Sequence, residues 1–258
     1  MNYINVIDQE NAINFQFENS KTEGCLINDA QGFEDAIAIN SIDDVASRIG
    51  AVAVNSKSGR RVISWVARFT CDVLTKRHSM QLALRRTGFL KLVKFQTIDN
   101  LSLQFEAYFD KLKAPYSSKT NSPMLLVFSA PDPRFYSQTL KTQVIARNTT
   151  AVVANAGSDS TSPVMRINGP ITAATINNLS GGESITLTYT LTAGQYVEID
   201  MQNQTILRET GVSVYSAVTG TPEFVLLAAG NNSIQFVATG GDANTTLNVS
   251  WRDAYNGI

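Results

Sequence analysis

The chain has 258 residues, of which 43% are hydrophobic and 17% charged, and its formal net charge is −1. This composition is too apolar for a disordered protein, and the length suffices for one large or two ordinary domains. A net charge near zero gives no general attraction to nucleic acid, and no apolar run is long enough to span a bilayer. The first residues lack the parts of a secretion signal, so we expect a soluble protein made in a cytoplasm.

Charge and glycine content divide the chain into two parts. Residues 1–147 contain 18 Lys and Arg against 14 Asp and Glu, a net charge of +4. Residues 148–258 contain 3 against 8, a net charge of −5, and they hold 11 of the 16 glycines. We therefore expect two domains, residues 1–138 and residues 139–258.

Alternation of apolar and polar residues predicts strands in the first part. Ile13, Phe15 and Phe17 fall on one face of an early segment. The segment LSLQFEAYF, residues 101–109, places its leucines, phenylalanines and alanine on one face and Ser, Gln, Glu and Tyr on the other. Both segments are typical of half-buried strands.

Two segments of the first part favour short helices. In SMQLALRRTG, residues 79–88, Ser79 is a candidate N-cap and Gly88 a candidate C-terminal stop. In SIDDVASRIG, residues 41–50, a serine again precedes and a glycine again ends the segment, and its two adjacent aspartates suit a helix N-terminus. We expect one or two short helices in an otherwise β-rich domain.

Positive charge is densest between residues 76 and 94, which hold six Lys and Arg interleaved with apolar residues. The interleaving indicates that half of the segment is core. A solvated or intersubunit face is therefore favoured over contact with a phosphate backbone. The candidate interface residues are Arg85, Arg86, Lys91 and Lys94.

The second part predicts an antiparallel β-sandwich. Apolar residues alternate in SITLTYTL, QYVEIDM and TTLNVSWRD, and glycine-containing turns recur roughly every 10–15 residues. Almost nothing in this part favours a helix.

Reactive side chains are too few to favour catalysis. The single histidine, His78, has no neighbouring carboxylate and nucleophile, and no zinc, P-loop or dinucleotide motif occurs. A glycosidase would need two carboxylates facing each other, but Glu198 and Asp200 share one face of one expected strand. We expect no enzyme activity, no catalytic or metal-binding residue and no cofactor.

Aromatic residues leave one binding alternative open. Sugar-binding sandwiches use exposed aromatic rings as platforms, and Tyr196 and Tyr215 are the candidates for exposed positions. Tyr189 and Trp251 instead fall on the apolar faces of their segments. A carbohydrate-binding module is therefore the second hypothesis.

The segment PMLLVFSAPDPRFYS, residues 123–137, resembles one in siphophage distal tail proteins, where an apolar strand runs into Pro-Asp-Pro, aromatic residues and a serine. SKSGRRVISWVARF resembles that family's strand after a glycine-arginine turn. The order of later segments resembles the family's C-terminal sandwich: NAGSDSTSPVMRINGP, INNLSGGESITLTYTL, AGQYVEIDMQNQTI, AAGNNSIQFVATG and NVSWRD. The resemblance covers nearly the whole chain and is strongest from about Leu125 onward.

The resemblance implies a mainly β fold, in which a β-sandwich-like ring domain with one or two short helices precedes a galectin-like antiparallel β-sandwich. It implies a structural virion protein at the distal end of a long non-contractile tail. Six copies would form a ring that joins the tail tube to the tail-tip hub and to receptor-binding or fibre proteins. Neither specific nucleic-acid binding nor membrane insertion is implied. In the alternative, the sandwich attaches to host surface glycans through Tyr196 or Tyr215.

Within this resemblance the segment SAPDPRFYS is a corner of the ring domain. Pro131 and Pro133 would stiffen the chain, and Asp132 would accept hydrogen bonds from neighbouring backbone donors. Phe135 and Tyr136 would hold the apolar side of the corner inward.

Overall fold

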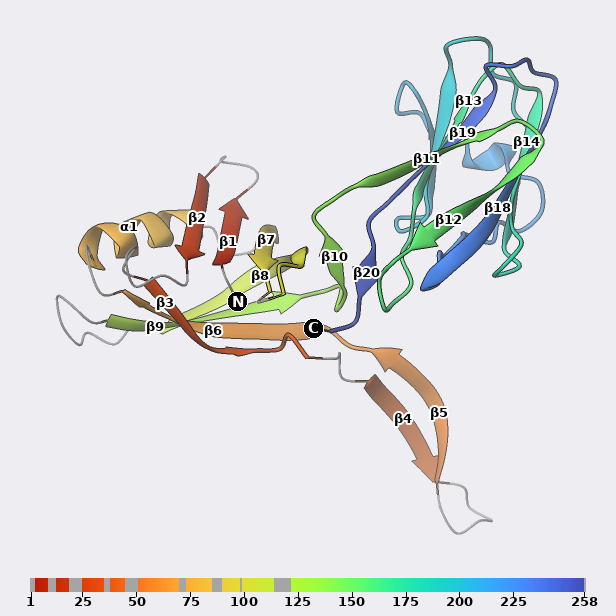
Figure 1. Ribbon diagram of the computed structural model, residues 1–258. Helices are drawn as coiled ribbons and strands as arrows, with labels where there is room; N and C mark the ends of the chain where they lie inside the picture. The colour runs from red at the N-terminus through yellow and green to blue at the C-terminus, as the bar shows by residue number, and fades with distance from the viewer. Residues whose placement is uncertain are drawn as a thin grey trace. The chain divides into compact units, whose positions relative to one another are not determined.

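The computed structural model describes residues 3–8, 13–18, 25–34, 38–44, 51–69, 73–84, 90–97, 99–113 and 122–257 (Figure 1). The fold is mainly β, as the sequence predicted. Two compact units divide the chain: unit 1 comprises Met1–Gln138 together with Asn256–Ile258, and unit 2 comprises Thr139–Tyr255. The last three residues therefore belong to the first unit, so the chain passes between the units twice.

Unit 1 contains one antiparallel sheet with the strand order β2-β1-β7-β8-β9-β6-β3, and β10 pairs with β8. Its strands are β1 (Tyr3–Asp8), β2 (Ile13–Glu18), β3 (Cys25–Gln31), β6 (Arg61–Phe69), β7 (Leu90–Gln96), β8 (Ser102–Lys113), β9 (Ser122–Ala130) and β10 (Phe135–Ser137).

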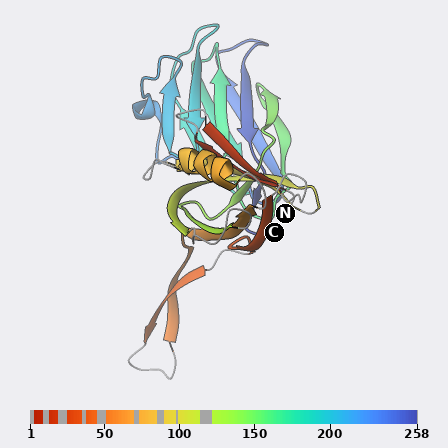
Figure 2. The ribbon, with the colours of Figure 1, turned by 90° about the vertical axis from the view of Figure 1, so that its left-hand side faces the viewer.

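The core of unit 1 lies on the inner face of this curved sheet. In β8, Leu103, Phe105 and Ala107 are buried, as their alternation predicted. The Phe17 ring of β2 lies 5.8 Å from the Trp65 ring of β6, so the curvature brings distant strands together. Figure 2 shows this curvature, with helix α1 (Val73–Leu84) against β1 and β2.

Helix α1 begins before the predicted position. Ser79 is an exposed residue inside the helix rather than its N-cap, and residues 85–88 of the predicted segment lie outside the described residues. Met80, Ala83 and Leu84 are buried at helical spacing. The first turns expose Leu74 and Thr75, so their sequence carries no apolar periodicity that would have revealed the true start.

The helix predicted for residues 41–50 is wrong for its first four residues. These belong to β4 (Ala38–Asp44), which pairs antiparallel with β5 (Ala51–Ser58), with Ile42 opposite Ala53. Residues 45–50 lie outside the described part. The serine and aspartates are weak helix formers, and pairing with the Ala- and Val-containing β5 decides the conformation instead. Among the described residues, β4 and β5 pair only with each other.

Unit 2 is a sandwich of a five-stranded sheet, β11-β19-β13-β16-β17, and a four-stranded sheet, β12-β18-β14-β15. The neighbouring strands in both sheets pair antiparallel. Its elements are β11 (Lys141–Ala146), β12 (Thr149–Asn155), β13 (Val164–Asn168), β14 (Ala173–Asn178), β15 (Ser184–Leu187), β16 (Tyr196–Asp200), β17 (Thr205–Arg208), η1 (Tyr215–Ala217), β18 (Gly230–Thr239), β19 (Thr246–Trp251) and β20 (Ala254–Tyr255).

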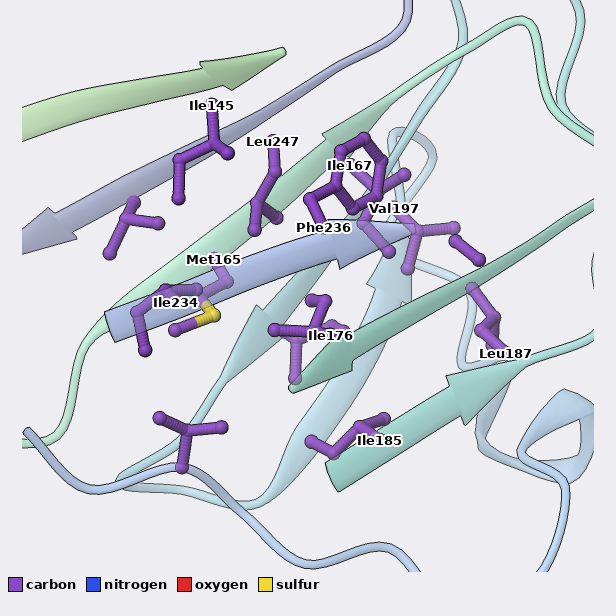
Figure 3. Close-up of a cluster of buried hydrophobic side chains, with 14 of the residues drawn as sticks. Ile145, Met165, Ile167, Ile176, Ile185, Leu187, Val197, Ile234, Phe236 and Leu247 are labelled. Carbon is purple, nitrogen blue, oxygen red and sulfur yellow. The ribbon is translucent and has the colours of Figure 1, made fainter. Parts of the chain in front are cut away.

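The two sheets of unit 2 bury their facing side chains between them. Figure 3 shows Met165, Val197 and Leu247 from the five-stranded sheet pointing toward Ile176 and Phe236 from the four-stranded sheet. Alternate residues of the same strands face outward, which is the pattern that the sequence predicted for β16 and β19. The strand ends and the outer faces therefore carry the polar side chains of unit 2.

Candidate interaction surfaces

Asp132 organises the Pro-Asp-Pro corner of unit 1. Its Oδ1 accepts hydrogen bonds from the Arg134 backbone N–H (3.0 Å) and Nε (2.9 Å). Its Oδ2 accepts hydrogen bonds from Arg134 Nη2 (2.8 Å) and from the Tyr136 hydroxyl (2.7 Å). Both carboxylate oxygens thus accept hydrogen bonds from within the corner. These bonds hold Asp132, Arg134 and Tyr136 in place relative to one another.

These hydrogen bonds shift the protonation of the Asp132 carboxyl. Burial by itself would raise the pKa of Asp132, but the hydrogen bonds from Arg134 and Tyr136 and the Arg134 charge outweigh that effect. The pKa of Asp132 therefore lies below its ordinary value. The corner favours the ionised carboxylate.

Phe135 and Arg61 connect the corner to the core of unit 1. Phe135 is fully buried, and its ring centroid lies 5.3 Å from that of Phe95 and 5.7 Å from that of Phe33. Arg61 is a residue that the sequence analysis did not single out, although it lies in the segment with the glycine-arginine turn. Its guanidinium lies over the Phe135 ring and donates hydrogen bonds to the Pro133 (2.6 Å) and Gly32 (3.0 Å) carbonyl oxygens. Tyr136 is half-buried.

The candidate basic residues of unit 1 do not form one exposed surface. Lys91 is fully buried, and its Nζ lies 2.8 Å from Asp8 Oδ2. The sequence could not show this, because Asp8 lies far away in the sequence, on β1, and becomes a neighbour of Lys91 only through the pairing of β1 with β7. Lys94 is partly exposed on the other face of β7, and Arg85 and Arg86 lie outside the described residues. Lys91 is therefore not available as a surface residue of unit 1.

A row of outward-facing residues crosses four strands of unit 1, and three of the four are exposed apolar side chains. Leu90 of β7 lies opposite Tyr108 of β8, Tyr108 opposite Ser129 of β9, and Ser129 opposite Val62 of β6. Leu90, Tyr108 and Val62 are 41%, 38% and 50% exposed. We call these four residues the cross-strand row. Three exposed apolar side chains in one outward-facing row form a candidate contact surface.

The two candidate sugar platforms of unit 2 have different surroundings. Tyr215 is exposed in η1, and its ring lies 6.4 Å from that of Phe224. Tyr196 is partly buried on the outer face of β16, where the guanidinium carbon of Arg166 lies 3.7 Å from its ring centroid. Arg166 thus occupies a face of Tyr196 that a sugar would otherwise use. The two tyrosines belong to different places in unit 2.

Within the described ranges, no group of three or more His, Cys, Asp and Glu side chains is placed to hold a metal ion. No helix in that same part of the chain has both the length and the apolar character needed to cross a membrane. The single histidine, His78, is exposed within α1. The surfaces described above are therefore the candidates for function.

Comparison with protein families identifies unit 2. Residues 156–255 match the family described as "Siphovirus-type tail component, C-terminal domain". Unit 2 belongs to this family of phage tail domains. No match to a curated protein sequence was found.

Comparison with solved structures extends the likeness to nearly the whole chain. The SPP1 Dit (gp 19.1) protein, described as a paradigm of the hub adsorption apparatus in phages that infect Gram-positive bacteria, matches with a TM-score of 0.74 at 13% sequence identity. The match covers 97% of this chain and 98% of that chain. A chain of the phage P2 baseplate in its activated conformation with Ca matches with a TM-score of 0.53 at 10% identity, over 96% and 97% of the two chains.

The family match and the shared fold confirm the resemblance to siphophage distal tail proteins that was drawn from the sequence. Residues 156–255 therefore form a domain of the kind found in phage tail components. The two solved structures, at 13% and 10% sequence identity, show the fold and carry no residue roles to this chain.

Proposed function

We propose that this protein is the subunit of a distal tail ring: six copies close through unit 1 and join the tail tube to tail-tip and receptor-binding or fibre proteins. The observation that carries the proposal is the match to the SPP1 Dit hub protein over nearly the full length of both chains. The role is geometric, because it requires surfaces that hold other proteins rather than groups that react. It places the protein in the virion, at the distal end of the tail, after synthesis in the host cytoplasm.

The isolated pair of strands β4 and β5 supports assembly through unit 1. A two-stranded antiparallel ribbon is marginally stable on its own in water. β4 and β5 pair with each other but with no other described strand. A neighbouring copy would supply the surface that such a ribbon lacks. A ring closes through contacts between two different surfaces of each subunit, and this ribbon provides one of them.

The cross-strand row supplies a candidate for the second surface. Val62 follows directly after Arg61, the first residue of β6, and the chain of β5 ends at Ser58. The row therefore begins close in sequence to the end of the ribbon. Three exposed apolar side chains in register across neighbouring strands form a surface whose burial would favour association.

The test is the oligomeric state of the full chain and of two matched variants. Val62→Glu places a charge in the cross-strand row, whereas Val152→Glu places one on an equally exposed position of β12 in unit 2. We expect hexamers and ring-shaped particles for the wild type and Val152→Glu, by light scattering after size exclusion and by negative-stain microscopy. Val62→Glu is expected to give monomers, because the contact would bury an unpaired charge.

A wild-type protein that stays monomeric at all concentrations, and forms no ring with isolated tail tubes, would overturn the proposed ring. If both variants form rings equally well, the proposed ring stands, but the cross-strand row is not one of its contact surfaces.

A further inference from the structure

Arg166 and Glu198 face each other on the outer surface of the five-stranded sheet without forming an ion pair. They are direct cross-strand neighbours of β13 and β16, and both are exposed. Opposite charges in this position ordinarily attract each other. In unit 2, which is described throughout, no salt bridge joins them and no hydrogen bond occupies the Glu198 carboxylate. Other contacts therefore hold the Arg166 side chain away from the Glu198 carboxylate.

Two neighbours fix the Arg166 side chain. Its guanidinium carbon lies 3.7 Å from the Tyr196 ring centroid, and its Nε donates a hydrogen bond of 2.9 Å to Asn168 Oδ1. Asn168 Nδ2 in turn donates to Thr246 Oγ1 at 3.0 Å. This chain of contacts crosses β16, β13 and β19. Because all its members lie on paired strands, the guanidinium is held in place by the sheet.

Unit 2 is described in full, and within it the terminal nitrogens of Arg166 remain available as hydrogen-bond donors. The Glu198 carboxylate remains available as an acceptor. Asn248 of β19 lies opposite Arg166 on its other side, and no hydrogen bond occupies its side-chain amide. The row Asn248, Arg166 and Glu198 thus offers amide, guanidinium and carboxylate groups in register. We call these three residues the polar row.

The other charged groups near the polar row already have hydrogen-bond or ion-pair partners. Arg208 Nη2 lies 2.7 Å from Glu209 Oε1. The Asp200 carboxylate accepts hydrogen bonds from the backbone N–H groups of Gln202 and Asn203 and from the Asn203 side chain. The polar row itself contains one positive and one negative group, so its own net charge is zero.

We propose that the polar row binds a neutral saccharide. Neighbouring hydroxyls of a sugar can donate to the Glu198 carboxylate and accept from the Arg166 guanidinium and the Asn248 amide together, which a purely anionic or cationic group cannot do. Glu198 would repel an anionic polymer, and Arg166 would repel a cationic one. Tyr196 acts as a positioning residue for Arg166, and not as the stacking platform that the sequence suggested. This site is independent of ring formation.

The full-length protein is tested on an array of neutral hexose and N-acetylhexosamine oligosaccharides, with sulfated and phosphorylated glycans alongside. The strongest neutral binder is then titrated by calorimetry. Each hydrogen bond to a charged side chain contributes enough that Glu198→Gln and Arg166→Met should each weaken binding at least roughly tenfold. Tyr196→Leu should weaken it similarly, and Tyr196→Phe, which keeps the ring beneath Arg166, should restore it.

The matched controls are Glu223→Gln and Arg147→Met, which make the same chemical changes in unit 2 away from the polar row. Both should bind like the wild type, and all six variants should keep the wild-type melting temperature because the changed side chains lie on the surface or in a turn. The proposal is overturned by binding to charged glycans alone, or by no binding to any neutral saccharide. It is equally overturned if Glu198→Gln binds as well as Glu223→Gln.

Discussion

The guanidinium carbon of Arg61 lies 4.4 Å from the centroid of the Phe135 ring. The same guanidinium donates hydrogen bonds to the carbonyl oxygens of Gly32, Glu34, Pro133 and Asn256. These acceptors come from three separate stretches of unit 1: residues 32–34, the corner and the returning C-terminal segment. One side chain at the start of β6 therefore fixes both places where the chain leaves and re-enters unit 1.

Replacing Arg61 by methionine should lower the free energy of unfolding of unit 1 by about 3–5 kcal/mol. Arg61 is only 5% exposed, so its loss leaves several carbonyl oxygens without their donor in a site that water reaches poorly. Arg60→Met, at the exposed neighbouring position, is the control and should change the free energy by less than about 0.5 kcal/mol. Urea denaturation measures both, and equal effects would contradict the anchoring role of Arg61.

Asp132→Asn should destabilise unit 1 at neutral pH and have little effect in strong acid. The folded pKa of Asp132 is lowered, so the folded state binds fewer protons than the unfolded state in this range. The stabilisation from its carboxylate is therefore present above the unfolded pKa of about 3.9 and is lost as the pH falls through the lower folded pKa. Chemical denaturation from pH 7 to pH 2 follows the difference between wild type and variant.

The control for this pH series is Asp99→Asn, which changes an exposed aspartate in the turn before β8. A difference between wild type and Asp132→Asn that stays constant over the whole pH range would contradict the linkage.

The buried pair of Lys91 and Asp8 should show strong coupling in a double-mutant cycle. Nζ and Oδ2 lie 2.8 Å apart, and both side chains are almost completely buried. Changing only one partner, in Asp8→Leu or Lys91→Met, leaves the other charge without compensation and should cost about 3–5 kcal/mol. The double variant Asp8→Leu with Lys91→Met should recover most of that loss. Additive effects of the two single changes would show that the pair is not coupled.

Asn155→Leu should destabilise unit 2 by about 2–4 kcal/mol. The fully buried amide donates from Nδ2 to the Asp159 (2.7 Å) and Leu227 (3.2 Å) carbonyl oxygens, and its Oδ1 accepts from the Gly157 N–H (3.1 Å). A leucine leaves these groups unpaired. Asn231→Leu, at an exposed position of β18, is the control and should be close to neutral. Thermal unfolding compares the two, and equal melting temperatures would refute the role of Asn155.

Alternation along the strands was readable in the sequence because a strand turns successive side chains to opposite faces. Leu103, Phe105 and Ala107 of β8 are buried for this reason, and so are Val197 and Ile199 of β16. The order of turns and strands in the second part was likewise sufficient to predict a sandwich. The start of α1 was not readable, because its first turns have no apolar face.

Long-range pairing was decided by the tertiary structure. Residues 41–44 are a strand because β5 lies beside them, and a local pattern could not reveal that partner. Lys91 belongs to a basic run in the sequence, but the sheet places it opposite Asp8 in the interior. The role of Arg61 could not be read locally, since the carbonyl oxygens that it binds come from other segments.

The alternation of residues, the positions of the turns and the family resemblance could all be read from the amino-acid sequence, since these properties depend on neighbours along the chain. The side chains that contact each other across strands became apparent only in the folded protein. Arg166 is held by Tyr196 and apart from Glu198 because strand register, set by burial of the core residues between them, fixes which groups are adjacent.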